Sequence, residues 1–236
     1  KSHFLSISFF MKQSYLYIVA TPLGNLEDIT LRAIRVLKEV DVVFCEDTRT
    51  TRVLLMAHSI EKPTESFHAH SSEAKVDRII EVLQEGKSIA LVTDAGTPGI
   101  SDPGTYLVAR AKEALGDTVG IVPIPGPTAF VAALSASGVP VDEFTFLGFL
   151  PHKKGRKTLF DEIRTSSRTC VFYESPHRLM KSLTSLLGAH KKVTVAKELT
   201  KIYEEFVSGT PEYVFDYFEK RSDKVRGEFV VIVSAP

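Results

Sequence analysis

The sequence predicts an α/β protein of two domains, with a mostly parallel sheet in the first domain and a mixed sheet in the second. From residue 14 onward, short apolar runs alternate with amphipathic stretches, which is the pattern of βαβ units. In the second half, the short apolar run 204–208 has no helical stretch before it, so one strand there is expected to run antiparallel. The chain has 236 residues, which is long for one compact core.

The first half is predicted to contain five strands separated by helices. Most of these strands are short runs rich in β-branched and aliphatic residues, and the helices are amphipathic stretches. Asp28 or Thr30 is expected to cap the first helix, because both side chains accept hydrogen bonds from free backbone N–H groups. The expected strands are 15–20, 42–46, 64–67, 88–92 and 119–123, and the expected helices are 30–39, 51–58, 72–85 and 106–115.

A proline-rich segment, residues 123–128, marks either a domain boundary or a second rigid loop. The predicted domains are therefore 14–124 and 125–236, and residues 1–13 are an expected upstream extension of poor order, with Met11 as the expected start. The expected strands of the second half are 144–148, 169–173, 193–197, 204–208 and 229–233, and its helices are 129–136, 158–164, 178–187 and 212–220.

Composition narrows the class of protein. Lys and Arg number 29 and Asp and Glu also number 29, so phosphate contacts are expected in local patches and not over the whole surface. No apolar run approaches the roughly 20 residues that cross a bilayer, and no membrane partner is expected. Cys45 and Cys170 lie in apolar runs, as buried thiols of a reducing cytoplasm do, and without a CxxC pattern no metal site is expected.

The loop 93–104 is the most informative segment. It carries three glycines, two prolines and two aspartates directly after an apolar strand, at the sheet edge where α/β proteins bind ligands. Glycine lets the backbone approach a ligand, and proline stiffens the loop. About a dozen turn-forming positions exceed the usual two to six residues of a βα loop, which favours a ligand site. The alternative is a long turn held by hydrogen bonds from Asp94 and Asp102.

Polar or Gly/Pro clusters also follow other predicted strands, at residues 20–26, 46–50, 174–178 and 197–201. Their convergence on one edge favours a binding site, although Asp47 or Thr48 equally suits a helix N-cap. Neither G-x-G-x-x-G nor G-x-x-x-x-G-K-[ST] occurs, so no nucleotide fingerprint is present. The basic run 152–157 fits either phosphate contact or a solvated helix start.

Seven segments together resemble the tetrapyrrole methylase family, and within it the branch that methylates the ribose 2′-hydroxyl of a cytidine in 16S rRNA. The resemblance runs from residue 15 to about residue 233. The segments are TPLGNLEDITLRA (21–33), EDTRTT (46–51), TDAGTPGISDPG (93–104), IPGPTA (124–129), GFLPHKKG (148–155), YESPHRL (173–179) and KELTKIYEE (197–205).

The resemblance implies a cytoplasmic homodimer that binds S-adenosylmethionine in a cleft between its two α/β domains and acts on 16S rRNA or the small ribosomal subunit. The cofactor-binding positions that it implies are Leu23, Asp94, Gly96, Thr97, Ile100, Thr128, Ala129, Tyr173, Glu174, Leu199, Thr200 and Gly227.

A ribose hydroxyl is a poor nucleophile and benefits from a general base. The sequence leaves four candidates open: Asp47, Asp94, Asp102 and Glu198. The alternative functions are C-methylation of a porphyrinoid and a non-catalytic RNA-binding module. The residues expected to contact RNA phosphates are Arg49, Lys153, Lys154, Arg156, Lys157 and Arg178.

Overall fold

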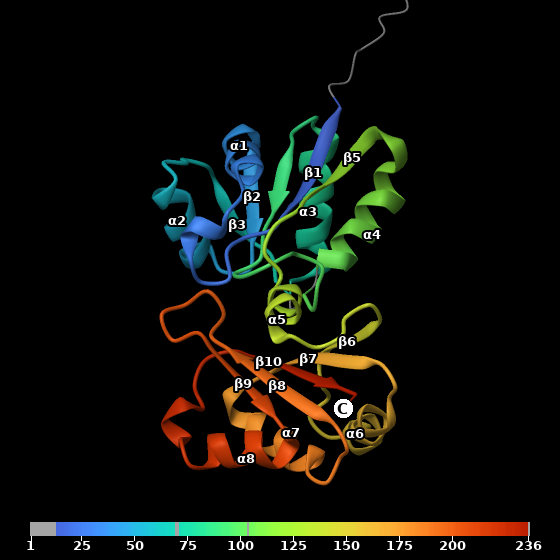
Figure 1. Ribbon diagram of the computed structural model, residues 1–236. Helices are drawn as coiled ribbons and strands as arrows, with labels where there is room; N and C mark the ends of the chain where they lie inside the picture. Colours follow the sequence, from blue (N-terminus) through green and yellow to red (C-terminus); the bar gives the residue numbers. More distant parts are fainter. Residues whose placement is uncertain (1–12, 69–70, 103, 236) are drawn as a thin grey trace, which may run out of the picture. The chain divides into compact units, whose positions relative to one another are not determined.

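The computed structural model describes residues 13–68, 71–102 and 104–235, so the extension expected over residues 1–13 lies outside it except for its last residue. The described chain divides into two compact units (Figure 1). The first contains the chain up to Thr21 together with Ile29–Gly126, and the second contains Pro22–Asp28 together with the chain from Pro127 onward. Each unit has its own five-stranded sheet with helices packed on it, which confirms the prediction of two α/β domains.

The first unit has an all-parallel sheet with the strand order β3-β2-β4-β1-β5. Its central strand is buried on both faces, as the continuous apolar run in the sequence predicted. The strands are β1 (Ser14–Val19), β2 (Val42–Cys45), β3 (Thr64–Ser66), β4 (Ile89–Leu91) and β5 (Val119–Ile124).

Two helices cover each face of this sheet: α1 (Leu31–Glu39) and α2 (Thr48–Ala57) lie on one side, and α3 (Glu73–Gln84) and α4 (Gly104–Leu115) on the other. The chain passes from β1 to β2 and β3 in one direction and returns to β4 and β5 in the other. Right-handed crossovers in opposite directions place their helices on opposite faces. Of the two predicted caps for α1, Thr30 takes the role, since its hydroxyl accepts a 3.1 Å bond from the backbone N–H of Ala33.

The second unit has a mixed sheet with the order β6-β7-β10-β8-β9, as predicted. Strands β6 and β7 are parallel, whereas β10 runs antiparallel to both β7 and β8, and β9 runs antiparallel to β8. The strands are β6 (Phe144–Phe149), β7 (Thr169–Glu174), β8 (Lys192–Lys197), β9 (Glu205–Gly209) and β10 (Phe229–Ser234).

The two faces of the second sheet are covered unequally. Helices α6 (Arg156–Thr165), α7 (Pro176–Leu186) and α8 (Pro211–Glu219) pack on one face, and α5 (Ala129–Ser137) packs on the other (Figure 1). Leu23, from the segment between β1 and α1, joins the apolar cluster on the α5 face. That segment contains a short 3₁₀ helix, Leu26–Asp28, and packs with the second unit.

Within the described ranges, no helix has the length and apolar character that crossing a bilayer requires. Both cysteines are buried free thiols.

Candidate functional site

Three loops meet at the carboxyl edge of the first sheet. Thr21, after β1, and Gly96, after β4, exchange two backbone hydrogen bonds of 2.9 and 3.0 Å. The hydroxyl of Thr21 also donates a 2.9 Å bond to the carbonyl of Thr93. Gly96 has φ = 91°, a conformation that favours glycine. These bonds hold the start of the 93–104 loop against the turn that follows β1.

A second set of bonds joins the ends of β2 and β4. Glu46 accepts a 2.6 Å bond from the hydroxyl of Thr93 and a 3.3 Å bond from the backbone N–H of Asp94. In the opposite direction, the carboxylate of Asp94 accepts a 3.1 Å bond from the backbone N–H of Asp47. The three carboxylates of Glu46, Asp47 and Asp94 therefore gather at one point of the sheet edge.

The pKa of Asp94 is raised from its ordinary value of 3.8, first by burial and then by the negative charges of Glu46 and Asp47. The hydrogen bond from the N–H of Asp47 acts in the opposite direction but does not cancel these effects. Asp94 remains exposed as a residue. It is thus a carboxylate at the surface of the loop with an increased affinity for protons.

Asp47 is the N-cap of α2. Its carboxylate accepts bonds from the backbone N–H of Arg49 at 2.8 Å and from the Arg49 guanidinium at 2.6 Å. These bonds lower its pKa from 3.8 to about 2. The capping role that the sequence left open for Asp47 is therefore the one the structure has, and a carboxylate with so low a pKa is a weak base.

Asp102 shapes the far end of the 93–104 loop. One of its oxygens accepts bonds of 2.7 Å from the backbone N–H groups of both Gly99 and Gly104. A Cβ at Gly104 would lie 2.8 Å from the nitrogen of Gly99, so this close approach requires glycine. Burial raises the pKa of Asp102, although the two N–H bonds oppose the shift.

In the second unit, four of the predicted cofactor-binding residues share one apolar cluster. Leu23 and Leu199 are buried in it, and Ala129 and Tyr173 pack against it, all on the α5 face of the sheet. The ring of Tyr173 lies 5.1 Å from that of Phe146 and 5.3 Å from that of Phe149, measured between centroids. Thr128 immediately precedes this group as the N-cap residue of α5.

The turn after β8 contains Glu198, Thr200 and Lys201. The carboxylate of Glu198 accepts 3.0 Å bonds from Lys201 and from the backbone N–H of Glu228. Burial alone would raise the pKa of Glu198, but these two partners lower it. Thr200 accepts a 3.2 Å bond from the backbone N–H of Asn25 and so ties the 22–28 segment to this turn. The side chain of Glu198 fills the space where Gly227 lacks a Cβ, so these two predicted positions lie side by side.

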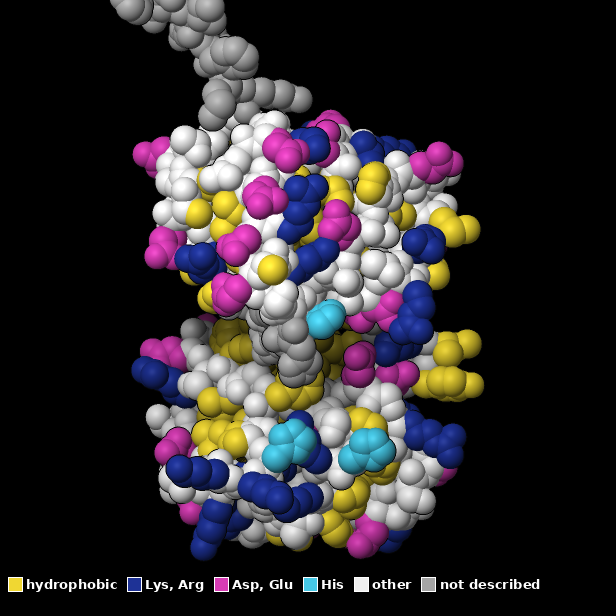
Figure 2. Space-filling model, turned by 180° about the vertical axis from the view of Figure 1, so that it is seen from behind, with side chains coloured by type: hydrophobic (Ala, Val, Ile, Leu, Met, Phe, Trp, Pro, Cys, Tyr) yellow, Lys and Arg dark blue, Asp and Glu magenta, His cyan; other side chains and the backbone are white. Residues whose placement is uncertain are grey.

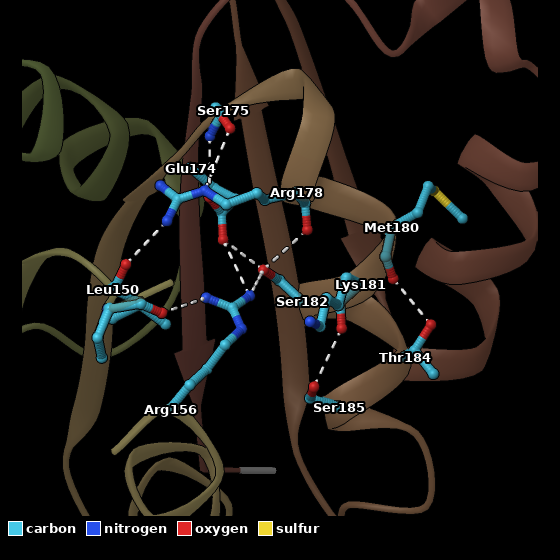
Figure 3. Close-up of polar contacts among 11 residues, drawn as sticks. Leu150, Arg156, Glu174, Ser175, Arg178, Met180, Lys181, Ser182, Thr184 and Ser185 are labelled. Atoms are coloured by element: carbon cyan, nitrogen blue, oxygen red, sulfur yellow. Dashed lines mark hydrogen bonds and ion pairs between the residues drawn. The ribbon is translucent and has the colours of Figure 1, made fainter. Parts of the chain in front are cut away.

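Glu174 lies on the opposite face from Tyr173, because successive residues of a strand point to opposite sides. Its side chain is 0% exposed and sits among donors (Figure 3). Arg178 approaches one carboxylate oxygen at 2.8 Å and Arg156 the other at 3.3 Å, and the hydroxyl of Ser182 bonds to the same oxygen as Arg156. Glu174 therefore has a structural role in this face of the unit, unlike the cofactor contact that the resemblance implied.

Two of the predicted RNA-binding arginines belong to this network. Arg156 is 6% exposed as a residue, and its guanidinium lies over the ring of Phe160. Arg178 is 15% exposed at its side chain and also bonds to the carbonyl of Leu150. The sequence predicted a phosphate contact for Arg156, whereas in this arrangement its guanidinium is buried against the carboxylate of Glu174.

The other predicted phosphate contacts do lie on the surface. Lys153, Lys154 and Lys157 are exposed in and just after the loop between β6 and α6. Figure 2 shows Lys and Arg side chains gathered, with His side chains beside them, on the face of the second unit that it presents. Arg49, in the first unit, has a side chain that is 89% exposed but is paired with Asp47.

A family model described as "Tetrapyrrole (Corrin/Porphyrin) Methylases" matches residues 15–213. The chain belongs to this family. Two solved tetrapyrrole-methylase structures have the same fold: a cobalt precorrin-4 methyltransferase, with a TM-score of 0.68 at 20% identity over 95% of this chain and 96% of that one, and the uroporphyrin-III-C-methyltransferase of Thermus thermophilus, with 0.63 at 21% identity over 94% of each.

Several relatives of this tetrapyrrole methylase carry the name "Ribosomal RNA small subunit methyltransferase I". That of Halalkalibacterium halodurans is 47% identical over 92% of this chain and 75% of its own length. That of Thermotoga maritima is 42% identical over 93% of this chain and 97% of its own length. That of Escherichia coli O157:H7 is 44% identical over 94% of this chain and 78% of its own length.

Two residues that hold the loops of this tetrapyrrole methylase had no predicted role: the sequence placed Glu46 in a polar cluster only, and it did not single out Ser182. Glu46 links β2 to β4, but that role depends on the two strands being neighbours, which the strand order alone reveals. Ser182 completes the shell around Glu174 from the middle of α7. Its one signal is a small polar residue on the apolar face of a helix, where a partner is required.

Proposed function

We propose that this chain transfers the methyl group of S-adenosylmethionine to the ribose 2′-hydroxyl of a cytidine in 16S rRNA. The observation that carries the proposal is the identity of 42–47% with relatives named for methylation of small-subunit ribosomal RNA, over more than nine tenths of this chain. The likeness to the porphyrinoid methyltransferases lies at 20–21% identity and supports the fold alone.

The residues at the edge of the first sheet suit the polar parts of the cofactor. S-adenosylmethionine supplies an electrophilic methyl group on a sulfonium, together with amino, carboxylate and hydroxyl groups that need hydrogen-bond partners. The exposed Asp94 carboxylate accepts such bonds, and Gly96 lets the loop backbone approach closely. We assign Asp94, Gly96, Thr97 and Ile100 to this contact.

The α5 face of the second unit suits the adenine ring. A planar, largely apolar base packs well against aliphatic and aromatic side chains, which Leu23, Ala129, Leu199 and Tyr173 provide within one cluster. The remaining residues assigned to cofactor binding on this unit are Thr128, Thr200 and Gly227, and Glu174 is no longer among them.

Asp94 is the best candidate for the general base. Asp47, Asp102 and Glu198 each hold a cap, a loop or a turn through two or more donors. Asp94 has its pKa raised by burial and by like charges, and of the four candidates it is the one that is exposed as a residue. In this role it would accept the proton of the 2′-hydroxyl as the oxygen bonds to the methyl carbon, while the bond from that carbon to the cofactor's sulfur would break and leave a neutral thioether.

Lys153, Lys154 and Lys157 are proposed to contact rRNA phosphates, with Arg49 as a further contact from the first unit. A loop of lysines provides the point charges that a phosphate backbone attracts. We also propose that the enzyme acts in the cytoplasm, with its ribosomal substrate, and that it is a homodimer. Light scattering of the purified protein tests the homodimer directly.

The deciding experiment incubates the protein with methyl-labelled S-adenosylmethionine and small ribosomal subunits from a strain that lacks the modification. Label is expected in 16S rRNA, in a dinucleotide that survives alkaline hydrolysis, because a methylated 2′-oxygen cannot attack the neighbouring phosphate. Thr97→Arg, which inserts a long side chain into the 93–104 loop, is expected to abolish both labelling and cofactor binding while the protein stays folded. Label that appears in an added porphyrinoid and never in rRNA would refute the proposal.

A further inference from the structure

Two arginines connect one buried carboxylate to the start of a surface loop. We call residues 150–157 the basic loop, because they contain Lys153, Lys154 and Lys157. Arg178 approaches Glu174 through Nε at 2.8 Å and donates from Nη1 to the carbonyl of Leu150 at 2.9 Å (Figure 3). Arg156 approaches Glu174 through Nη2 at 3.3 Å and donates from Nη1 to the carbonyl of Pro151 at 3.2 Å. Each guanidinium thus bridges the carboxylate and one of two consecutive carbonyls.

The carboxylate of Glu174 is also held by its own strand end and by α7. It accepts a 2.9 Å bond from the backbone N–H of Ser175 and a bond from the hydroxyl of Ser182. Burial without such partners would be strongly unfavourable for the charge, so the four donors and the carboxylate hold one another in place. The network is therefore a fixed point within the second unit.

The basic loop is attached to this point at both ends. Leu150 and Pro151 are bound at its beginning, and Arg156 itself begins α6 near its end. The backbone N–H of Arg156 also bonds to the carbonyl of Lys153 at 3.3 Å, which closes the turn between them. The lysines consequently extend into solvent from a backbone whose ends are fixed. A loop fixed beforehand loses less conformational entropy when it binds a partner.

We propose that Glu174 is a positioning residue for RNA recognition, and that it acts through Arg156 and Arg178 to fix the basic loop against the phosphates of the substrate. The inference rests on the proposed function for the identity of the partner. It assigns to Glu174 a role in substrate binding that involves no contact with substrate or cofactor. Arg156 and Arg178, which the sequence suggested as phosphate contacts, thereby hold the loop that carries the exposed lysines.

The test uses Arg178→Lys in the full chain. A lysine keeps a positive charge beside Glu174, but one ammonium cannot reproduce the planar bridge to both the carboxylate and the carbonyl of Leu150. We expect the Kd for small ribosomal subunits, and the KM in methyl transfer, to rise about tenfold, since the freed lysines must be ordered on binding. The kcat at saturating subunits and the Kd for S-adenosylmethionine should stay unchanged. Lys181→Gln, which removes an exposed charge from α7 outside the network, is the matched control and should bind subunits like the unchanged protein.

A double-mutant cycle distinguishes positioning from general damage. If Glu174 and Arg178 act through the lysines, Arg178→Lys adds nothing to the loss already caused by Lys153→Gln with Lys154→Gln. Losses that add in full, or a fall in cofactor affinity, would overturn the inference. So would a subunit affinity that Arg178→Lys leaves intact.

Amide hydrogen exchange reports, without any RNA, on the attachment of the basic loop to Glu174 through Arg156 and Arg178, which we call the tether. Residues 152–157 should show a larger increase in exchange rate than the amides of β7 and α5 in both Arg178→Lys and Glu174→Gln. If the unchanged protein neither binds nor methylates rRNA, the proposed function fails and the RNA part of this inference fails with it, whereas faster exchange would still establish the tether. Unchanged exchange in both variants would reject the tether whatever the substrate is.

Discussion

Asp94 and Glu174 are two carboxylates that both lie at or just after the end of a strand, but their surroundings in the structure are opposite. Asp94 follows β4 in the first unit, and Glu174 ends β7 in the second. Asp94 is an exposed residue, and its carboxylate lies beside those of Glu46 and Asp47. Glu174 is fully buried beside Arg156 and Arg178. One carboxylate therefore has like charges around it and the other has opposite charges.

The sign of the neighbours separates the two roles. Like charges and burial disfavour the ionised form of Asp94, which increases its affinity for a proton. Two guanidiniums and two further donors bind both carboxylate oxygens of Glu174 and leave it no free lone pair for a substrate. A carboxylate at the end of a strand is thus a candidate for chemistry only when its partners leave it available.

The sharpest test of this contrast replaces Asp94 with Asn. We expect kcat for methyl transfer to fall by about 10² to 10⁴, which is the usual contribution of a general base. Folding stability should be unchanged or slightly higher, because the fold disfavours the negative charge that is removed. Single-turnover transfer and a thermal melt measure the two effects. In the unchanged enzyme, the rate should decrease as the pH falls through a pKa above 3.8, and a variant that keeps full activity would exclude Asp94 as the base.

Glu174→Ala should have its largest effect on stability instead. Removal of the carboxylate leaves two buried guanidiniums without a counter-charge, a change that typically costs about 3–5 kcal/mol. Urea unfolding measures the loss, and Lys181→Gln on the exposed side of α7 serves as the control with little expected change. A loss below about 1 kcal/mol would mean that the network relaxes easily, and the contrast with Asp94 would disappear.

The sequence predicted the course of the chain well, because each element carries its own local signal. All the expected strands and helices are present, and the boundaries that differ by more than one residue are the starts of α2, α4, α6 and α7. Helix α2 begins at Thr48 because Asp47 caps it, and α7 begins at Pro176 because proline suits the first position of a helix. The packing of residues 22–28 with the second unit has no local signal, since it depends on Thr200 and Lys201 far along the chain.

The candidate site was less predictable for the same physical reason. The motif residues Tyr173 and Glu174 were interchangeable in the sequence, yet strand alternation sends them to opposite faces. Arg156 belongs to a run of basic residues, and only the buried carboxylate on β7 shows that it differs from Lys153, Lys154 and Lys157. Local composition indicates charge, whereas tertiary partners determine what the charge does.

Asp102 provides an intermediate case, since its carboxylate is held by backbone N–H groups alone. Asp102→Ala should cost about 1–3 kcal/mol, because two partly buried N–H donors of the 93–104 loop lose their acceptor. It should also weaken cofactor binding, which calorimetric titration measures. Asp102→Asn keeps an acceptor oxygen in place and should retain most of both properties. If Asn and Ala behave alike, the negative charge of Asp102, and not only its acceptor oxygen, is required to hold the loop.

The smallest expected effect concerns Asp47, whose charge serves a helix cap. Its pKa falls from 3.8 to about 2 on folding, so the ionised form stabilises the fold. That stabilisation is complete above the pKa of the unfolded state and disappears as the pH falls through the pKa of the folded state.

Asp47→Ser keeps the cap without the charge. The gap in thermal midpoint between the two proteins should therefore be present at neutral pH and close in acid. It should also narrow in high salt, since the Arg49 partner is 89% exposed. A gap that is constant in both series would show that the serine cap is simply poorer. The charge of Asp47 would then contribute nothing to the stability of the fold.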